Sequence, residues 1–301
     1  MDARTRRWVE EHVGSFDIVS TYAHEHGYSQ LWRLRIAGGR IGDKHVWLKC
    51  HRHPPKWAGE VHALTKWAPE LGLAPETLAW RASPPAVILS EVPGRPAQSL
   101  SLAPDQERRL WAEAGEWLRR LHSRTNPWLG GLNPDGSAHG ETTTDAEGFV
   151  IEICDRRLRE GHEDGLFTPE EAEFIRTRSR EWATSLRGAG AHAIHRDFSP
   201  RNWMAHEDGS LAAVIDFEHA RWDVRAADLN RWWDHEFLRH PELEDAFFEA
   251  YGRPDPTLQA QILMMRLLNC GGGYVWAARN NSPDYAIRLR AGLHRLMEER
   301  A

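Results

Sequence analysis

The nine residues from His195 to Trp203 constrain this chain more than any other stretch. They read His-Arg-Asp-Phe-Ser-Pro-Arg-Asn-Trp, and Asp216 follows fourteen residues after Asn202. Residues 191–194 and 211–215 are apolar and strand-like, and an Asp-Gly pair between the two halves predicts a turn. Asn202 and Asp216 are therefore expected to flank a short hairpin, with their side chains converging at one end of it.

Two carboxylates and one amide at these separations suit phosphoryl transfer. Asp197 can orient an acceptor hydroxyl and take its proton, while Asn202 and Asp216 offer hard oxygen ligands for Mg²⁺ beside nucleotide phosphates. His195 is expected to brace the loop through hydrogen bonds rather than to act as the base. A polar loop that only satisfies backbone groups is the ordinary alternative, and the joint spacing of Asn202 and Asp216 argues against it.

The same stretch resembles the catalytic loop of the aminoglycoside phosphotransferase and choline-kinase-like families, which are relatives of protein kinases. The resemblance implies an α+β, bilobal protein-kinase-like fold. Its small N-terminal lobe would hold a five-stranded antiparallel sheet and one helix, and its larger C-terminal lobe would be mainly helical. The nucleotide-binding lobe is placed at residues 1–91. The catalytic and substrate-binding lobe is placed at residues 92–301, with a helical insert at about 141–186.

The hydrophobic pattern along the chain agrees with that order of elements. Strands are predicted at residues 16–23, 31–36, 44–50, 75–80 and 86–89. Helices are predicted at residues 2–13, 56–70, 104–122, 146–160, 168–186, 226–238, 242–251, 256–279 and 283–300. The helix at 256–279 is expected to break at its three consecutive glycines, 271–273. The Pro-, Gly- and Asn-rich stretch 123–140 is predicted to be a loop.

Lys49 and Glu60 are the candidates for holding nucleotide phosphates. Lys49 ends an apolar strand, from which a flexible ammonium could reach the α- and β-phosphates. Glu60 lies on the following helix and is its natural ion-pair partner, although it could instead only complement the helix dipole. Gly27 and Ser29 belong to a hairpin loop whose backbone N–H groups could cover phosphates. With a single glycine, a plain turn is the alternative there.

The segment 90–94 is predicted to mark the lobe boundary, because its Pro-Gly pair breaks regular structure. In the family this segment is the hinge that holds adenine, and the resemblance assigns those contacts to the Ser90 carbonyl and the Val92 N–H. Asp228 resembles the family's acidic residue that ties back to the catalytic loop. It could equally be a charge at a helix N-terminus.

Two arginines depart from the family's commoner pattern. Arg196 and Arg201 stand where many members have glycine. Neither change removes a catalytic group, but both alter the charge near the acceptor. The two arginines therefore make the acceptor harder to identify, whereas they leave the predicted type of reaction unchanged.

Composition excludes several classes of function. The formal charge of −6 argues against a nucleic-acid-binding protein, and no run of eighteen apolar residues could span a membrane. The N-terminus lacks the apolar core of a signal peptide. The three cysteines form no C-x-x-C pair and predict reduced thiols in a cytoplasmic protein. The sequence makes no prediction about oligomeric state.

The leading hypothesis is an ATP- or GTP-dependent kinase of a small-molecule hydroxyl, foremost an antibiotic phosphotransferase acting on an aminoglycoside or a cationic peptide antibiotic and conferring resistance. A kinase of a metabolite hydroxyl (a sugar or an amino alcohol), or of Ser/Thr in a biosynthetic peptide, is the alternative within enzymes. A non-catalytic kinase-like nucleotide-binding module is the alternative from another class. Such modules normally lose the lysine, aspartate or asparagine, and none is lost here.

The acceptor is expected to be cationic, because the helical insert at 141–186 holds twelve acidic and six basic residues. In the resembling families this insert walls the acceptor cleft, and carboxylates collect polyamine substrates. The candidate acceptor contacts are Asp155, Glu163, Glu218 and Asp228. A solvated acidic helix pair would have the same composition and is the alternative.

Overall fold

The computed structural model describes residues 1–23, 28–37 and 44–299. The chain forms two compact units, each built from several segments. The sheet unit comprises residues 1–110, 131–140 and 197–221, and the helical unit comprises residues 111–130, 141–196 and 222–301. This division does not test the lobe boundary predicted between residues 91 and 92. Among the described residues, no helix combines the length and the apolar character needed to cross a membrane.

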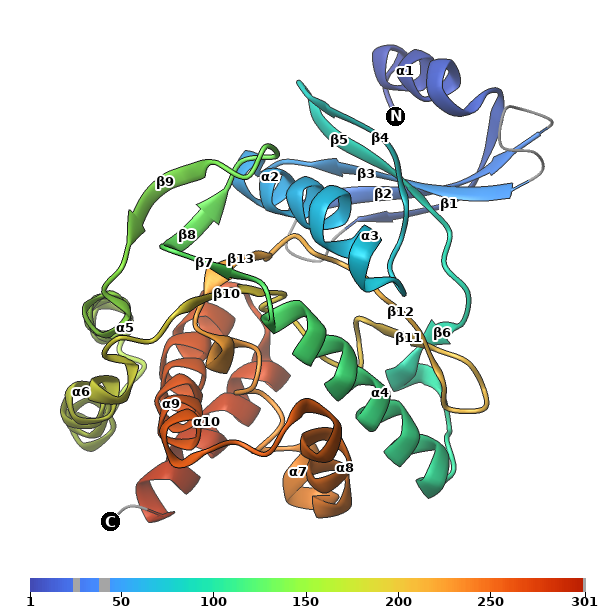
Figure 1. Cartoon of the computed structure of the whole chain (residues 1–301). Helices are drawn as coiled ribbons and strands as arrows, with labels where there is room; N and C mark the ends of the chain where they lie inside the picture. Colours follow the sequence, from blue (N-terminus) through green and yellow to red (C-terminus); the bar gives the residue numbers. More distant parts are fainter. Residues whose placement is uncertain (24–27, 38–43, 300–301) are drawn as a thin grey trace. The chain divides into compact units, whose positions relative to one another are not determined.

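The sheet unit contains the five-stranded antiparallel sheet that the sequence predicts (Figure 1). Its strands lie in the order β1-β2-β3-β5-β4. Their bounds are β1 (Phe16–Ala23), β2 (Ser29–Ile36), β3 (Lys44–His51), β4 (Thr77–Ala82) and β5 (Pro85–Ser90). On one face, Leu34, Val46 and Leu48 form a core with Val9 and Val13 of the helix α1 (Ala3–Val13). Because strand side chains alternate, the other face of β3 presents Lys49 to the helix α2.

The helix predicted at 56–70 consists of three consecutive pieces. They are α2 (Pro54–His62), one π-helical turn (Ala63–Trp67) and α3 (Ala68–Leu71). The Trp57 indole anchors α2 to the sheet by donating to the Ala86 carbonyl at 3.2 Å. Glu60 lies on the buried side of α2, with only 2% of its side chain exposed. The helix therefore holds a carboxylate against the Lys49 face of the sheet.

Gly59 allows α2 to approach the segment that follows Asp216. A Cβ atom at this position would lie 2.6 Å from the carbonyl oxygen of Ala220, closer than such atoms come in proteins. The backbone around Ala220 is fixed by a turn, in which its N–H donates to the Phe217 carbonyl at 2.9 Å. The glycine thus sets how near Glu60 can come to the carboxylates of the neighbouring segment.

We expect Gly59→Ala to lower the free energy of unfolding by up to about 2 kcal/mol, because an overpacking cost of about 1–3 kcal/mol outweighs the gain of about 1 kcal/mol in helix propensity. Chemical denaturation measures this change. Gly190→Ala is the matched control, since the nearest atom to its added Cβ would be 3.6 Å away. Equal stability of the two variants would contradict the packing argument.

The predicted hairpin between Asn202 and Asp216 is present in the sheet unit. Strands β11 (Trp203–Ala205) and β12 (Leu211–Val214) pair antiparallel, and β6 (Arg95–Pro96) adds a third strand in the order β12-β11-β6. Gly94 precedes β6 with φ +83°, and a Cβ atom there would lie 2.6 Å from the Ala205 carbonyl oxygen. Both its conformation and its closeness to β11 require glycine at this turn.

The helical unit contains most of the predicted helices. They are α5 (Ala146–Glu163), α6 (Pro169–Ala183), α8 (Pro241–Tyr251), α9 (Pro256–Arg279) and α10 (Pro283–Glu299), and α4 (Pro104–His122) begins in the sheet unit and ends here. An aromatic cluster of Trp111, Trp232, Phe237 and Phe247 packs inside this unit with ring centroids 4.8–6.5 Å apart. All four side chains are buried, so the cluster is part of the core of this unit.

The prediction of a loop at 123–140 is wrong. This stretch contains β7 (Thr125–Asn126), β8 (Leu129–Leu132) and the start of β9 (Ala138–Thr143). They belong to a sheet with the order β7-β10-β13-β8-β9, together with β10 (Ala191–Ile194) and β13 (Arg221–Asp223). Pro127, Pro134 and Gly136 lie in the turns between these short strands, whereas Gly130, Gly131 and Gly140 lie within β8 and β9. The partner of β7 in β10 and the partner of β8 in β13 lie about 65 to 90 residues away in the sequence, so local composition cannot reveal those pairings. β8 also pairs with its sequence neighbour β9.

The prediction of one helix at 226–238 is also wrong. The structure has a 3₁₀ turn (Arg225–Ala227), an irregular stretch and the short helix α7 (Glu236–Arg239). Side chains take over the backbone groups that a helix would use: Asn230 Nδ2 donates to the Ala227 carbonyl at 2.9 Å, and Trp233 Nε1 donates to the Leu229 carbonyl at 2.7 Å. Such bonds compete with helix formation.

The helix α9 continues through its three glycines, contrary to the predicted break. Cβ atoms on Gly271, Gly272 and Gly273 would lie only 3.1–3.2 Å from Ile175, Arg157 and Leu289, respectively. Those residues belong to α6, α5 and α10. The glycines therefore let three helices pack closely against α9, and this packing offsets a propensity cost of about 1 kcal/mol per glycine.

Glu171 joins α6 to α10 inside the helical unit. Its carboxylate accepts hydrogen bonds from Arg290 Nε at 2.9 Å and from the Thr168 N–H at 2.8 Å, and it lies 2.7 Å from His294 Nε2. Burial by itself would raise the pKa of Glu171, but the hydrogen bonds from Arg290, Thr168 and His294 outweigh it and lower the pKa to about 2. The charged carboxylate is therefore a stabilising group in the folded protein.

Because the pKa of Glu171 is lower in the folded protein than its value of 4.5 in the unfolded chain, the charged carboxylate stabilises the fold. This contribution is complete above pH 4.5 and is lost as the pH falls toward 2. We expect Glu171→Gln to cost about 2–3 kcal/mol at pH 7. The difference in melting temperature between Glu171→Gln and the unmodified protein should stay constant from pH 7.5 to 5.5. It should become smaller by pH 3.5. The exposed neighbour Glu170→Gln is the control. A gap that does not change below pH 4.5 would contradict the role of the charge.

Candidate active site

Lys49 is the centre of a buried ionic cluster in the sheet unit. Its ammonium lies 3.0 Å from Glu60 Oε1, 2.7 Å from Asp216 Oδ1 and 3.1 Å from Glu218 Oε2. Only 5% of the Lys49 side chain is exposed. The predicted ion pair between Lys49 and Glu60 is thus confirmed, and the structure adds two carboxylates from the segment after β12.

The charges in this cluster stabilise one another. Burial alone would lower the pKa of Lys49, but the carboxylates of Asp216, Glu60 and Glu218 outweigh it and raise the pKa well above its ordinary value. Burial would likewise raise the pKa of Glu60 and Glu218, and the lysines beside them lower both instead. Lys49, Glu60 and Glu218 are therefore ionised at neutral pH, so Lys49 is a fixed positive charge.

Lys56 is the member of this cluster that sequence reasoning missed. It lies in the first turn of α2, and its ammonium contacts Glu218 Oε1 at 2.7 Å. The same ammonium lies 4.0 Å from the centre of the Tyr28 ring. Glu218, predicted to contact the acceptor, instead has 1% of its side chain exposed and is shared between two lysines. The only signal in the sequence was the rarity of lysine, with four in the whole chain.

Asp197 and Asn202 are held together at the start of the hairpin. Asn202 Nδ2 donates to Asp197 Oδ2 and to the Asp197 carbonyl, both at 2.9 Å. Arg201 Nη2 donates to the same carboxylate oxygen at 2.7 Å, and 7% of the Asp197 side chain is exposed. Arg201, one of the two departures from the family pattern, therefore acts directly on the candidate base.

Asn202 and Asp216 are tied by the backbone, because the Ile215 N–H donates to the Asn202 carbonyl at 2.9 Å. The Asn202 amide nitrogen is used by Asp197, which leaves its side-chain oxygen for another partner. Asp216 has φ +65°, an uncommon value for a residue other than glycine that is often found at functional sites. The backbone hydrogen bond thus brings together the two segments that carry the residues predicted to hold the metal.

This donor set fits Mg²⁺. Within the described ranges, no group of three or more His, Cys, Asp or Glu residues could enclose a metal ion. One amide oxygen and one carboxylate instead suit an ion that keeps several waters and completes its coordination with phosphate oxygens. The metal roles of Asn202 and Asp216 stay predictions, supported by this chemistry.

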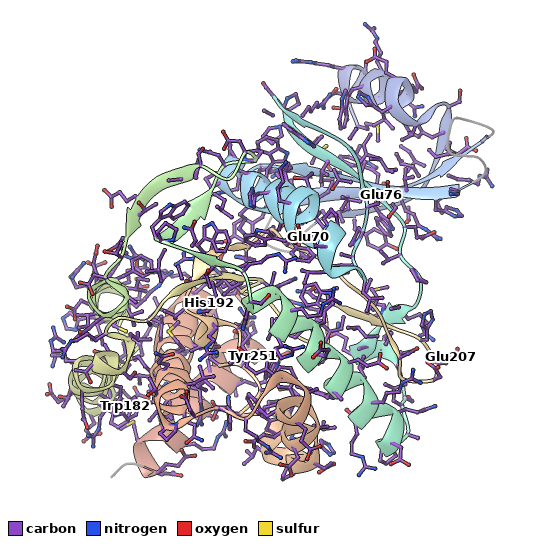
Figure 2. All side chains as sticks on the ribbon, viewed as in Figure 1. Glu70, Glu76, Trp182, His192, Glu207 and Tyr251 are labelled. Atoms are coloured by element: carbon purple, nitrogen blue, oxygen red, sulfur yellow. The ribbon has the colours of Figure 1, made fainter. Side chains whose placement is uncertain are left out.

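Asp228 braces the residues just before Asp197, as the resemblance implied. In the helical unit its carboxylate accepts the backbone N–H of His195 at 2.8 Å and that of Arg196. His122 Nε2 contacts it at 3.1 Å, and the Tyr251 hydroxyl lies 2.7 Å from His122 Nδ1 (Tyr251 is labelled in Figure 2). No helix begins at Asp228, so the alternative of a helix N-terminal charge is wrong. With no exposed side-chain surface, Asp228 is not available to an acceptor.

Arg196 is held in a strained conformation by the same network. Its φ is +65°, in the left-handed region where glycine is favoured. Its N–H donates to Asp228, and its carbonyl accepts from Arg231 Nη2 at 2.9 Å. Glycine would adopt this φ without strain, and the two hydrogen bonds show how this chain keeps an arginine there.

A pair of aromatic rings lies beside the cluster on the β-sheet. Trp47 precedes Lys49 by two residues on β3 and so shares its face of the sheet. The Tyr22 ring lies 5.7 Å from it, and 54% of Tyr22 is exposed. Flat rings on this face offer a surface for a nucleobase. Sequence reasoning missed both residues, because their approach depends on strand register.

The predicted hinge residues leave the sheet at the end of β5. The Ser90 N–H and Oγ bond the backbone of Glu76 (labelled in Figure 2), each at 2.9 Å. Val92 follows outside regular structure. Ser29 opens β2 and is buried, whereas Gly27 lies outside the described residues. The nucleotide contacts assigned to Ser90, Val92, Gly27 and Ser29 stay predictions.

The insert's candidate acceptor residues are paired with arginines within the helical unit. Asp155 accepts from Arg180 at 3.1 Å, and Glu163 lies 3.8 Å from Arg279. Other carboxylates of the insert pair with Arg187 and Arg290, outside the counted stretch. The acidic excess counted in the sequence is thus partly neutralised by the fold. This pattern matches a solvated acidic helix pair as well as an acceptor surface.

Comparison with known proteins identifies the family. Residues 23–260 match the phosphotransferase enzyme family (APH), which is most of the chain. The chain belongs to this family. It is therefore a nucleotide-dependent phosphotransferase, as the catalytic stretch predicted. A search of curated proteins finds no match to the chain.

Solved structures of the family share the fold over nearly the whole chain. The GDP complex of wild-type aminoglycoside 2′-phosphotransferase-IIIa aligns with a TM-score of 0.70 at 12% identity, covering 99% of each chain. A thermostable mutant of aminoglycoside phosphotransferase APH(4)-Ia, bound to ADP and hygromycin B, aligns at 0.67 with 16% identity, covering 97% of this chain and 98% of the other. A putative fructosamine-3-kinase from Thermobifida fusca YX-ER1 aligns at 0.66 with 17% identity, covering 96% and 98%. The predicted kinase-like fold is confirmed.

Proposed function

We propose that this phosphotransferase moves the γ-phosphate of ATP or GTP to a hydroxyl of a small molecule. The observation that carries the proposal is that Lys49, Asp197 and Asp216 lie in one compact unit, with Lys49 bonded to Asp216. A fixed cation for phosphate, a carboxylate beside an amide, and oxygen donors for a metal are the parts that phosphoryl transfer needs.

In the proposed reaction, Asp197 orients the acceptor hydroxyl and receives its proton as the oxygen attacks the γ-phosphorus. The bond from that phosphorus to the β–γ bridging oxygen breaks, and the nucleoside diphosphate leaves. Lys49 neutralises the non-transferred phosphates, and Glu60 holds Lys49 in place. Asn202 and Asp216 would hold Mg²⁺, which when bound offsets phosphate charge. The hydrogen bond from Asn202 Nδ2 fixes the Asp197 carboxylate for proton transfer.

The acceptor class we favour is an antibiotic, an aminoglycoside or a cationic peptide, so that the protein would confer resistance. Family membership supports this choice, as does the likeness to structures named for aminoglycoside phosphotransferases. The fructosamine-3-kinase among the structural matches keeps a metabolite hydroxyl as the alternative. A non-catalytic module is disfavoured, because the lysine, both aspartates and the asparagine are all present.

A phosphorylation screen tests the proposal. Purified protein, Mg²⁺ and γ-labelled ATP or GTP are incubated with panels of antibiotics, sugars, amino alcohols and Ser/Thr peptides, and label transfer is measured. Asp197→Ala is the inactive control. We expect transfer to at least one hydroxylated acceptor, abolished by the substitution. Nucleotide binding without transfer to any panel would favour the non-catalytic module instead.

The acidic insert predicts that the acceptor is cationic, with Asp155 and Glu163 contributing to its binding. We expect KM for the acceptor to rise several-fold from low to high salt, because screening weakens the attraction of a cation to clustered carboxylates. Asp155→Asn and Glu163→Gln should raise KM with kcat nearly unchanged. A neutral acceptor, or a KM indifferent to salt and to both substitutions, would sink this prediction and favour the metabolite or peptide alternative.

A further inference from the structure

Lys56 is built into the Lys49 cluster, although it lies on a different element. Its ammonium is bonded to Glu218 Oε1 at 2.7 Å, lies 3.2 Å from His219 Nε2 and rests over the Tyr28 ring at 4.0 Å. These three contacts fix a side chain that is normally mobile. Only four lysines stand against thirty-four arginines in this chain, and two of the four are in this cluster.

One carboxylate bridges the two lysines. Glu218 Oε1 contacts the Lys56 ammonium, and Glu218 Oε2 contacts the Lys49 ammonium at 3.1 Å. Oε2 is buried, and the Lys49 ammonium is its counter-charge. Two ammonium groups that share one carboxylate are close enough to be shared by one phosphate chain. Lys56 also has more access than Lys49, with 16% of its side chain exposed against 5%.

The charges of the cluster leave a role for the second lysine. Three carboxylates (Glu60, Asp216 and Glu218) and two lysines give one net negative charge, which would repel a triphosphate. A metal ion on Asp216 would engage one carboxylate, and Glu60 and Glu218 would still oppose Lys49. Two lysines offset those two carboxylates and leave the charge of the metal ion for the phosphates. The aromatic face of Tyr28 holds the Lys56 ammonium without adding a further negative charge.

We propose that Lys56 is a second phosphate-contacting cation, which Glu218 holds beside Lys49 until a nucleoside triphosphate binds. The assignment rests on the proposed function and adds a binding residue to it. The competing explanation is structural: Lys56 would only neutralise the buried Glu218 carboxylate. The two explanations differ in what happens when both charges are removed together.

The test is calorimetry with Mg²⁺ and a non-hydrolysable ATP analogue, with adenosine as the probe that lacks phosphate. The variants are Lys56→Met, Glu218→Gln and the double variant. Lys66→Met is the matched control, an exposed lysine in the π-helical turn that follows α2. We expect Lys56→Met to weaken the analogue about tenfold and to leave adenosine within about twofold, because only the analogue carries phosphate. The control should leave both affinities within about twofold.

The double variant decides between the two explanations. If Lys56 contacts phosphate, the double variant stays at least about fivefold weaker than the unmodified protein. If Lys56 only neutralises Glu218, removing both charges restores the affinity, and that result overturns the proposal. If Lys56→Met binds the ATP analogue as tightly as the unmodified protein does, the proposal for Lys56 is overturned. The proposed function would still stand in that case, because the unmodified protein binds the nucleotide. An unmodified protein that binds no nucleotide would overturn both.

A second variant covers the case in which Lys56→Met fails to fold. Lys56→Arg keeps the positive charge and should retain the analogue affinity to within about threefold. Lys56→Gln removes the charge while keeping a polar side chain, and it should reproduce the tenfold loss. Melting temperatures of both variants establish that they are folded. Equal analogue affinity of the arginine and glutamine variants would overturn the proposal.

Discussion

Asp197→Ala is expected to abolish turnover while leaving nucleotide affinity nearly unchanged. A positioned general base contributes about 10²–10⁴ in rate, so we expect a loss of at least several hundred-fold in kcat. The carboxylate contacts Asn202 and Arg201, and we propose that it serves the acceptor chemistry and not the phosphates. Single-turnover kinetics and calorimetry with a non-hydrolysable nucleotide measure the two effects separately.

Two further variants sharpen this test. Asp197→Asn keeps the size and polarity of the side chain but cannot take a proton, so it should be nearly as inactive as the alanine variant. Asp208→Ala is the control, an exposed aspartate at the turn of the same hairpin. Turnover of either Asp197 variant within a few-fold of the unmodified protein would mean that another group is the base.

Lys49→Ala is expected to have the largest combined effect on stability and nucleotide binding. It leaves the buried carboxylates of Glu60 and Glu218 without their shared counter-charge. Removing one partner from a buried ionic cluster costs about 3–5 kcal/mol of unfolding free energy. The affinity for a magnesium nucleotide should fall at least about tenfold, because the charge that we propose to face the phosphates is lost. Thermal denaturation and calorimetry give the two quantities.

Variants of the partner carboxylates separate the two effects of Lys49. Asp216→Ala should also weaken magnesium nucleotide, but not nucleotide without the metal, because its proposed partner is the ion. Glu60→Gln should reproduce part of the Lys49 defect by loosening the ammonium from α2. Unchanged affinity in all three variants would remove the nucleotide site from this cluster.

Several features of this protein follow from the sequence alone because their causes are local. Alternating apolar residues determine the five strands, and the spacing of Asn202 and Asp216 around an Asp-Gly turn determines the hairpin that carries them. Lys49 lies near the end of a strand and Glu60 lies on the helix that follows it, so their ion pair could be predicted. The kinase-like fold itself came from the resemblance of the catalytic stretch, not from composition.

Tertiary structure decided which groups surround those residues. Glu218 and Lys56 are 162 positions apart, and only the packing of α2 against the segment after β12 makes them partners. The aromatic pair of Tyr22 and Trp47 depends on strand register in the same way. The carboxylates of the insert look like an acidic surface in the sequence, but arginines brought from elsewhere by the fold pair with several of them.

The wrong element predictions have the same physical origin. Within residues 123–140, β7 and β8 pair with strands from distant segments, and β8 also pairs with β9. Residues 226–238 do not form one helix because side chains occupy their backbone groups. The glycines of α9 stay helical because three neighbouring helices pack against them. The local sequence pattern determines which backbone conformations are low in free energy. Long-range packing and charge pairing contribute more free energy than propensity does, so they determine which of these conformations is adopted.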